Sequence, residues 1–510
     1  MSLTFTDLFC GAGGSSTGLV AAGLELTLAA NHWQRAIETH AANHRDADHL
    51  CANIDNYDMR RLPRTDVLWA SPICTELSPA GGRPRKRPKK GAGPGQGMFE
   101  LEAEGAVASA AYERTRATFW DVIRATEIHR YQAVIVENVA EAADWELFDI
   151  WLAGMRTLGY RHQFVSVSSA HVGGTDNTPA PQWRDRIYVL LTREGVPLPD
   201  VAPRPIAWCP VCEQDVAAFQ SWKKPGARQL GKYGQQYVYR CPNGPVCRHQ
   251  VVEPYVRPAA DIIDWTNLGV RIADRPQHKL PPLAASTLRR ITAGLAALGE
   301  RRMLLTVSHG GHNGRPVPVD SAPLAARTAK IGDALLVPDG AFYVKNYGGN
   351  ARPSDLVRSI SEPFGTVTAR DSHALAVPPQ AEDAFVVTLR RNATAEPVSA
   401  PVDTVTTGRH HWLVIPYRNA APKTTGEPLH TLGTIDSAAI ASPAPVLEEC
   451  HYRMIQPREQ LLAQRFPTDY IVHGTKGEQT MQAGNAVSCN VAQWLGERLH
   501  AALARTATAG

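Results

Sequence analysis

The chain has 510 residues, a formal net charge of +4, 44% hydrophobic residues and 20% charged residues, a composition typical of globular rather than disordered or collagen-like proteins. Its length predicts roughly two to four domains, and so small a net charge does not by itself indicate a nucleic-acid partner. The nine cysteines are thinly spread, which argues against a secreted disulfide scaffold. No apolar run approaches the ~20 residues of a membrane span, and the first residues lack the regions of a signal peptide. We therefore expect a cytoplasmic protein without a membrane partner.

Alternating strands and helices are predicted over about the first 195 residues. Short apolar strands are expected at Leu3–Phe9, Asp66–Ala70, Ala133–Val136 and Ile187–Leu191. Helical patterns cover Ser16–Ala22, Arg116–His129 and, near the C-terminus, Gly484–Arg505. Such alternation predicts an α/β fold with a mostly parallel sheet covered by helices.

Residues 201–260 differ in composition, with eight Lys and Arg against three Asp and Glu. Aromatic and basic residues gather there: Trp208, Trp222, Tyr233, Tyr237, Lys223, Lys224 and Arg228. Such a surface suits nucleic acid, and the core of a hairpin would use the same aromatic residues.

Four cysteines of this stretch form two knuckles. Cys209-Pro-Val-Cys212 and Cys241-Pro-Asn-Gly-Pro-Val-Cys247 are separated by 28 residues, which is typical of a tetrahedral, four-thiolate zinc ribbon. Because the second knuckle is longer than Cys-x-x-Cys, His249 is an alternative to Cys247. Four protein ligands leave no open position, so we predict a structural rather than a catalytic Zn²⁺.

An internal repeat of four short units is present in residues 301–445. The units begin at Pro323, Pro363, Pro401 and Pro428, and each meets a second proline 15 positions later with an aliphatic residue three positions before it. This spacing predicts a small-stranded array with variable loops. The array is either purely architectural or a surface that reads a ligand. Side chains able to contact purine edges, which are also common in turns, precede the units at Asn313, Arg315, Asn350, Arg352, Asn392 and Asn419.

A glycine-rich turn, Asp7-Leu-Phe-Cys-Gly11-Ala-Gly13-Gly14, follows the first strand and opens a helix. Glycines let a backbone turn sharply and approach a ligand, and a helix N-terminus offers free N–H groups to a polar ligand. Plain tight turns and dinucleotide enzymes share this pattern, although the spacing is not the Gly-x-Gly-x-x-Gly of NAD enzymes.

Polar side chains also stand at the ends of later strands. Cys74 lies just beyond the second strand, where open α/β sheets bind ligands, and is either a nucleophile or a small buried residue. Glu137 ends an apolar strand, which is unfavourable unless the carboxylate is paired or functional. Gln182, Arg184 and Arg186 alternate and are expected on one face of a strand. Strand-end salt bridges are the alternative reading of these polar positions.

Taken together in their order along the chain, these motifs resemble those of the cytosine-C5 DNA methyltransferases. The resemblance runs through the glycine-rich turn, Pro72-x-Cys74, Glu137-Asn-Val, Gln182-x-Arg-x-Arg, the stretch from Arg453 to Pro467, and Gln482-Ala-Gly-Asn-Ala-Val487. It covers about residues 1–195 and 450–505. It implies a Rossmann-like S-adenosylmethionine-dependent core with a large inserted β-rich recognition region. We expect the catalytic part at 1–200, a zinc-ribbon insert at 201–260, a target-recognition region at 261–445, and a return to the catalytic domain at 446–510.

The resemblance implies a role for each strand-end residue. Cys74 would attack C6 of a cytosine flipped out of double-stranded DNA, after which C5 takes the methyl group. Glu137 would hold N3, and Arg186 with Arg184 would steady O2 and the surroundings of the nucleophile. Gln182 would contact the nucleic acid. The base that removes the C5 proton is not identified, and we expect the chain to act as a monomer.

The cofactor residues that the resemblance implies are Phe9, Gly11, Gly13, Gly14, Asn31, Asn53, Ile54, Pro72, Asn485 and Val487. Two of them depart from the family pattern, because Asn31 and Asn53 stand where acidic residues are usual. Asn31 can still bind a ribose hydroxyl, without charge assistance, and Asp55 is a possible substitute for the second. Ile73 and Thr75 also differ from the usual residues on either side of the cysteine.

A basic run follows Cys74 by nine residues. It contains Arg83, Arg85, Lys86, Arg87, Lys89 and Lys90. Charge runs are often solvated loops, but the resemblance implies a loop that closes on DNA and contacts phosphates.

Two other functions remain as alternatives. An RNA cytosine-C5 methyltransferase would use the same chemistry, although the large insert favours DNA. A catalytically silent DNA-binding protein would not need Cys74, Glu137 and Arg186 together.

Overall fold

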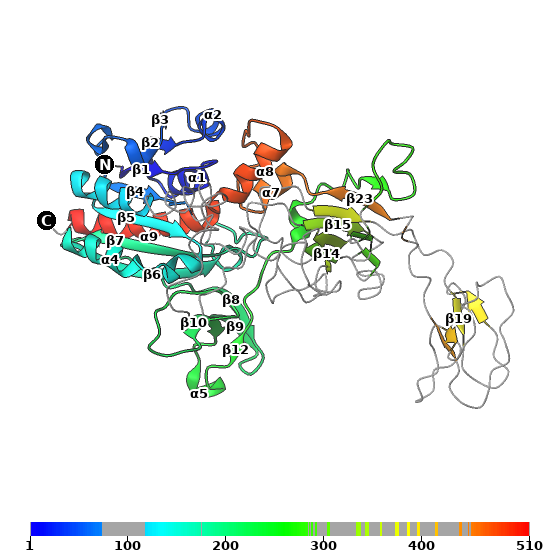
Figure 1. Cartoon of the computed structure of the whole chain (residues 1–510). Helices are drawn as coiled ribbons and strands as arrows, with labels where there is room; N and C mark the ends of the chain where they lie inside the picture. Colours follow the sequence, from blue (N-terminus) through cyan, green and yellow to red (C-terminus); the bar gives the residue numbers. More distant parts are fainter. Residues whose placement is uncertain are drawn as a thin grey trace, which may run out of the picture.

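The computed structural model describes residues 2–73, 118–174, 176–283, 447 and 450–508, several positions between 285 and 292, and the backbone of short strands between Met303 and Ile440 (Figure 1). Cys74, the basic run that begins at Arg83, and the Asn and Arg residues that precede the repeat units lie outside the described residues. None of the helices in the described part is long and apolar enough to cross a membrane.

A seven-stranded sheet forms the centre of the first part of the chain. Its strands are β1 (Thr4–Leu8), β2 (Glu25–Asn31), β3 (Asp48–Cys51), β4 (Val67–Ala70), β5 (Ala133–Asn138), β6 (Tyr160–Ser168) and β7 (Asp185–Arg193). They lie in the order β3-β2-β1-β4-β5-β7-β6, with the first five parallel and β7 antiparallel to both neighbours. The predicted α/β class is confirmed. The predicted strands correspond to β1, β4, β5 and β7. The sequence did not predict β2, β3 and β6, and polar residues interrupt the apolar pattern of β6.

The order of the strands reverses between β1 and β4. From β1 the chain builds outward through β2 and β3, then returns to place β4 on the other side of β1. Ligands of open α/β sheets bind at such a switch point, outside the carboxyl ends of the strands. The glycine-rich turn after β1 and the segment that leads from β4 to Cys74 both begin at this edge.

Helices cover both faces of the sheet. They are α1 (Gly14–Ala21), α2 (Gln34–Asn43), α4 (Phe148–Thr157), α9 (Cys489–Thr508) and a helix over 118–129. Two further helices, α7 (Pro457–Leu462) and α8 (Lys476–Asn485), pack in a separate buried cluster with Ala12 and Tyr470. On one face, Leu19 of α1 and Leu495 of α9 share a buried cluster with Trp69 of β4. On the other face, Phe119 and Trp151 pack with Val134 of β5. The buried strands therefore lie between two helical layers.

The predicted C-terminal helix is divided in two. The pattern predicts one helix over Gly484–Arg505, but α8 ends at Asn485 and α9 begins at Cys489, with Ala486 extended between them. A Cβ on Gly14 would lie 1.9 Å from the carbonyl oxygen of Val487. The break therefore lets the backbone at Val487 press against the start of α1, a contact that only glycine allows at position 14.

Residues 206–252 form a small separate fold, the cysteine module, which lies below the large sheet in Figure 1. Its elements are β8 (Ile206–Cys209), β9 (Gln214–Ala217), β10 (Phe219–Trp222), β11 (Tyr237–Arg240), α5 (Gly244–Cys247) and β12 (Val251–Val252). β8 and β9 form a hairpin, and β10, β11 and β12 form an antiparallel sheet. The cysteines stand at the turns of these strands.

A second seven-stranded sheet follows the cysteine module. It contains β13 (Val270–Arg271), β14 (Met303–Thr306), β15 (Asp333–Val337), β16 (Phe342–Lys345), β17 (Val357–Ser359), β18 (His373–Ala376) and β23 (His451–Met454). Strand β23 pairs with both β18 and β15, and β16 pairs with the same two strands. These four strands therefore form a closed ring. The sheet thus takes β23 from residues 446–510, which the sequence assigns to the catalytic domain.

A strand occurs near the second proline of every repeat unit. β15 precedes Pro338 and β18 precedes Pro378, while β21 (Val414–Pro416) and β22 (Ala438–Ile440) pair with each other. Another pair is β19 (Phe385–Val387) with β20 (Ala395–Pro397). The four repeat units, which are similar in sequence, therefore each have a strand near their second proline, although these strands belong to two different sheets.

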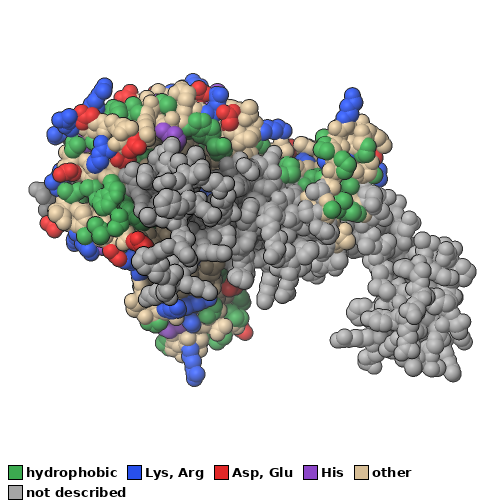
Figure 2. Space-filling model, viewed as in Figure 1, with side chains coloured by type: hydrophobic (Ala, Val, Ile, Leu, Met, Phe, Trp, Pro, Cys, Tyr) green, Lys and Arg blue, Asp and Glu red, His purple; other side chains and the backbone are tan. Residues whose placement is uncertain are grey.

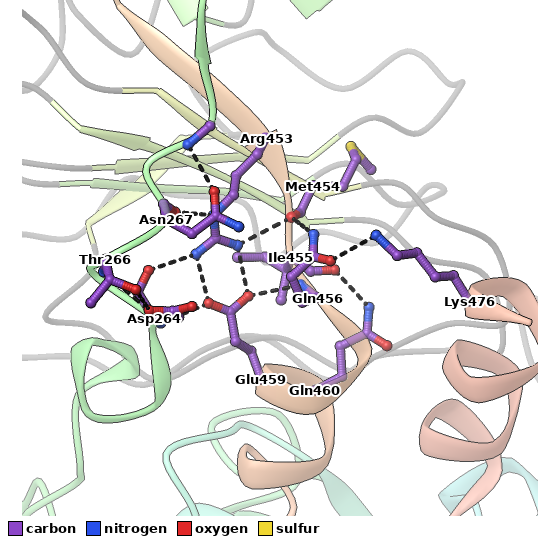
Figure 3. A network of polar contacts seen from close by, with 11 residues as sticks. Asp264, Thr266, Asn267, Arg453, Met454, Ile455, Gln456, Glu459, Gln460 and Lys476 are labelled. Carbon is purple, nitrogen blue, oxygen red and sulfur yellow. Dashed lines mark hydrogen bonds and ion pairs between the residues drawn. The ribbon is translucent and has the colours of Figure 1, made fainter. Parts of the chain in front are cut away.

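A buried ion pair joins the second sheet to the C-terminal helices (Figure 3). The NH1 and NH2 groups of Arg453 in β23 donate to the two carboxylate oxygens of Glu459 in α7 at 2.8 and 2.7 Å. Glu459 also accepts from the backbone N–H groups of Gln456 at 2.7 Å and Asp264 at 2.8 Å, and Arg453 donates to the carbonyl of Asn267. The pair thus fastens both ends of the inserted region, at residues 264–267 and 453–459.

Candidate active site and cysteine cluster

The turn after β1 uses backbone conformations that favour glycine. Gly11 and Gly13 have φ of 54° and 90°, and Phe9 adopts φ of 63° although it is not glycine. An aromatic residue in this region is strained and persists only when its surroundings hold it. A Cβ on Gly11 would meet no atom within 4 Å, whereas one on Gly13 would lie 2.6 Å from the hydroxyl of Tyr470. Of the three predicted cofactor glycines, Gly11 therefore faces open space, while Gly13 and Gly14 also serve close packing.

Asn31 and Asn53 lie along the same edge of the sheet. Asn31 ends β2, and its side-chain oxygen accepts from the backbone N–H of Trp33 at 2.9 Å, so its amide nitrogen remains to donate to a ligand. Asn53 follows β3 and precedes the buried Ile54. Phe9, Asn31 and Asn53 thus follow three neighbouring parallel strands.

A buried polar network lies beneath the glycine turn, and the sequence did not predict it. Asp7 is fully buried, and its Oδ2 accepts from the hydroxyls of Ser15 and Ser16, both at 2.6 Å. Nε2 of His40 lies 3.0 Å from the Ser16 hydroxyl, and Nδ1 lies 2.8 Å from Nε2 of His49. Burial raises the pKa of Asp7 to about 7 and lowers the pKa of His40 well below its ordinary value. The network therefore ties β1, α1, α2 and β3 together through buried polar contacts.

Glu137 and Arg186 form an ion pair at the edge that holds the candidate site. Glu137 lies near the end of β5 and Arg186 near the start of antiparallel β7, and Arg186 Nε lies 3.1 Å from Glu137 Oε1. Their side chains are 13% and 10% exposed for Arg186 and Glu137, respectively, so the charges compensate each other in a mostly dry environment. The structure therefore brings together two of the predicted catalytic residues.

Arg184 has a different set of partners. It is buried just before β7, and its NH2 group donates to the carbonyl oxygens of Gly484 at 3.2 Å and Ala486 at 2.7 Å. These carbonyls belong to the end of α8, where backbone acceptors lack helical partners. Arg184 thus holds the C-terminal segment, with Val487, against the core, while Asn485 is exposed beside it.

Gln182 is fully buried, and the hydroxyl of Ser169 donates to its backbone carbonyl at 2.8 Å. The contact of Gln182 with nucleic acid stays a prediction, and it requires exposure of a residue that is buried in this structure. The alternating pattern placed Gln182, Arg184 and Arg186 on one strand face, but β7 begins only at Asp185.

The segment that leads to Cys74 is held at its start. The side-chain amide of Asn138 donates to the carbonyl of Pro72 at 3.0 Å, and the backbone N–H of Ile73 donates to the hydroxyl of Thr118 at 3.2 Å. Asn138 is the last residue of β5 and directly follows Glu137, so the last described residues before Cys74 are held at the end of the strand that carries Glu137. The sequence motif contained Asn138, but nothing in the pattern indicated this contact.

The four predicted metal ligands come together in the cysteine module. The sulfur atoms of Cys209, Cys212, Cys241 and Cys247 all lie within 4.8 Å of one another, and those of Cys212 and Cys241 are 3.8 Å apart. Zn–S bonds of about 2.3 Å in a tetrahedron place sulfur atoms about 3.8 Å apart. The set can therefore hold a tetrahedral metal with little rearrangement.

Hydrogen-bond donors lie next to two of the cysteine sulfur atoms. Asn243 directs its backbone N–H toward Cys241 at 3.5 Å and its side-chain amide toward Cys212 at 3.6 Å, and such donors are usual around metal-bound sulfur. His249, the alternative ligand, has its Nδ1 3.0 Å from the carbonyl of Cys241 and is not part of the cluster. Cys247 therefore completes the set.

The surface of the cysteine module is basic. Figure 2 shows Lys and Arg side chains on this module at the bottom of the view, and Lys223, Lys224 and Arg248 are exposed. Tyr237 is fully buried in the core of the module, whereas Trp208 is half-exposed. The aromatic residues noted in the sequence thus divide between core and surface.

A family model described as C-5 cytosine-specific DNA methylase matches residues 3–207 and 380–501, more than half of the chain. A comparison with curated protein sequences finds no match.

Among solved structures, the chain is similar to a prophage-encoded protein of E. coli provisionally assigned as a DNA modification methyltransferase, with 13% identity and a TM-score of 0.42 over 99% of this chain and 100% of the other. It is also similar to a mutant of Spodoptera frugiperda DNMT2, with 12% identity and a TM-score of 0.44 over 98% and 100%. The methyltransferase EhMeth of Entamoeba histolytica has 11% identity and a TM-score of 0.44 over 98% of each chain. These structural similarities are remote, so the assignment to a family rests on the sequence model.

Proposed function

This chain belongs to the C-5 cytosine-specific DNA methylase family, and we propose that it performs DNA cytosine-C5 methylation through Cys74, Glu137 and Arg186. The observation that carries this assignment of roles is the Glu137–Arg186 ion pair of 3.1 Å, next to the segment that leads to Cys74. N3 and O2 are neighbouring atoms of cytosine, so a carboxyl group and a guanidinium that already lie side by side match that edge of the base.

We propose the following course for the reaction. The Cys74 thiolate forms a bond from sulfur to C6 of a cytosine that has been flipped out of the duplex. Glu137 supplies a proton or a hydrogen bond at N3, and Arg186 donates to O2, as negative charge develops on the ring. The electron pair displaced from the C5–C6 double bond makes C5 nucleophilic, and C5 takes the methyl group. A general base, which the described residues do not identify, then accepts the C5 proton, and the C5–C6 double bond forms again as the C6–sulfur bond breaks and the Cys74 thiolate leaves.

We propose that the cofactor is S-adenosylmethionine, which supplies an electrophilic methyl group when bound. Support comes from the switch point between β1 and β4, from the open space at Gly11, and from the side-chain amide of Asn31 at the same edge. Phe9 would pack on the adenine, and Asn53 with Ile54 would lie at its far end. Pro72, Asn485 and Val487 would complete the pocket.

We propose that double-stranded DNA is bound by the inserted region at 261–445 and by the basic run. Arg83, Arg85, Lys86 and Arg87 would contact phosphates, because they follow the nucleophile closely in sequence.

Replacement of Cys74 by serine is expected to abolish 5-methylcytosine formation, because a hydroxyl is a much weaker nucleophile than a thiolate. Labelled S-adenosylmethionine would be incubated with duplex DNA or RNA, and the modified base would then be identified. Retained DNA binding by Cys74→Ser shows that the variant folds. Equal 5-methylcytosine yields from both proteins would contradict the assignment of Cys74, and modified RNA alone would contradict the DNA substrate.

We propose that the four clustered cysteines hold a structural Zn²⁺. One zinc per chain is expected in purified protein, and Cys212→Ser should lose it. Cys51→Ser is the matched control, because Cys51 is an exposed cysteine outside the cluster. Atomic spectroscopy measures the metal, and a zinc content near zero in the unmodified protein would refute the proposal.

A further inference from the structure

One segment of the cysteine module, residues 228–234, lies against the catalytic sheet. Ser166 of β6, which is buried, is the main attachment point: its hydroxyl donates to the carbonyl of Gln229 at 3.3 Å and accepts from the N–H of Gly231 at 3.2 Å. Gln220 donates to the carbonyl of Ser166 at 2.8 Å. Arg228 adds an ion pair with Asp149 of α4. The module is therefore docked on the core by specific polar contacts.

Two consecutive residues of this segment reach the two strands that carry the catalytic ion pair. Lys232 Nζ lies 2.5 Å from Glu141 Oε1, in the short helix Ala140–Asp144 that follows Glu137. The N–H of Tyr233 donates to Asp185 Oδ1 at 3.0 Å, and Asp185 directly precedes Arg186. Residues 232 and 233 thus join the end of β5 to the start of β7 from outside the sheet.

An aromatic cluster strengthens the same connection. The ring of Tyr233 stacks on Trp183 with centroids 5.7 Å apart and an interplanar angle of 14°. The buried His171 lies edge-on to Trp183 at 4.9 Å, to Tyr233 at 4.4 Å and to Tyr239 at 5.1 Å. Tyr239 lies in β11, two residues before the predicted metal ligand Cys241. A continuous line of packed side chains therefore runs from the cysteine cluster to the segment that precedes Arg186.

We propose that the cysteine module is a positioning element of the catalytic site, in which Lys232 and Tyr233 keep Glu137 and Arg186 in register for the flipped cytosine. This inference rests on the roles proposed for Glu137 and Arg186. The module then acts on the chemical step through the two strands rather than through contact with the base. Displacement of a catalytic group by about 1 Å can lower a rate by up to about 100-fold, so contacts that fix the ends of these two strands can control turnover without touching the base.

The test compares Lys232→Met with Lys224→Met. Both remove one lysine charge from the same module, but Lys224 is exposed, and within the described part of the chain its amino group makes no hydrogen bond or ion pair. With plasmid DNA from cells that lack cytosine methylation, Lys232→Met should lower kcat about tenfold, while KM for S-adenosylmethionine, zinc content and the melting temperature match those of Lys224→Met. Lys232→Arg should restore most of kcat, because it restores a cation for Glu141.

A double-mutant cycle separates positioning from a general loss of structure. Glu141→Gln should also lower kcat, and the pair Lys232→Met/Glu141→Gln should be no slower than either single variant, because both remove the same contact. Equal kcat for Lys232→Met and Lys224→Met, with an active unmodified protein, would overturn the inference alone. An unmodified protein that forms no 5-methylcytosine would overturn the proposed function and this inference with it.

Discussion

Replacement of Glu137 by glutamine is expected to lower the rate of methyl transfer by about 10²- to 10⁴-fold. Glutamine has nearly the same volume, so the buried end of β5 keeps its packing. The change removes the carboxyl group that lies 3.1 Å from Arg186. The amide that replaces it cannot exchange a proton with N3 as charge develops on the ring. Single-turnover transfer of a labelled methyl group to unmethylated plasmid DNA measures the effect.

Glu127→Gln is the matched control for this prediction, because it makes the same change at an exposed position of the helix over 118–129. It should methylate DNA at the unmodified rate. A Glu137→Gln rate within a few-fold of the control would contradict the role of Glu137 in the chemical step.

Removal of one partner of the Arg453–Glu459 pair should destabilise the protein by about 3–5 kcal/mol. The two side chains are 7% and 3% exposed, so Glu459→Leu leaves a guanidinium buried without its carboxylate. It also takes the acceptor from the N–H groups of Asp264 and Gln456. Denaturant unfolding followed by intrinsic fluorescence should show the loss as a lower unfolding midpoint.

The double variant Arg453→Met/Glu459→Leu should recover much of this stability, because apolar residues replace the buried pair without leaving a charge. The control is Asp261→Asn, which breaks the partly exposed ion pair with Arg257 and should change stability by less than about 1 kcal/mol. A Glu459→Leu midpoint equal to that of Asp261→Asn would contradict the prediction.

Much of the catalytic edge could be predicted from local sequence. Phe9, Pro72 and Glu137 each follow or end a short apolar strand, and the carboxyl ends of parallel strands meet at one edge of a sheet. The spacing of the two knuckles likewise predicted a cluster of four ligands that includes Cys209, Cys212 and Cys241, because a knuckle is a local structure. The patterns could not decide whether Cys247 or His249 is the fourth ligand, because that depends on how the turn at 244–249 folds back.

The partners of individual polar side chains were decided by the tertiary structure. Arg184 and Arg186 look equivalent in sequence, yet Arg184 donates to Ala486 and Arg186 pairs with Glu137. Gly14, assigned to the cofactor from the motif, also gives room to the backbone of Val487.

The sequence by itself determined the α/β class of the core, the family and the residue types at the strand ends, because these depend on short-range periodicity and on ordered motifs. Only the tertiary structure decided that Lys232 meets Glu141 and that Arg453 fastens both ends of the inserted region. The partners in these contacts are brought together from distant parts of the chain by the order of strands in the sheets and by the docking of one module on another. A local sequence pattern does not determine the order of strands in a sheet or the docking of one module on another.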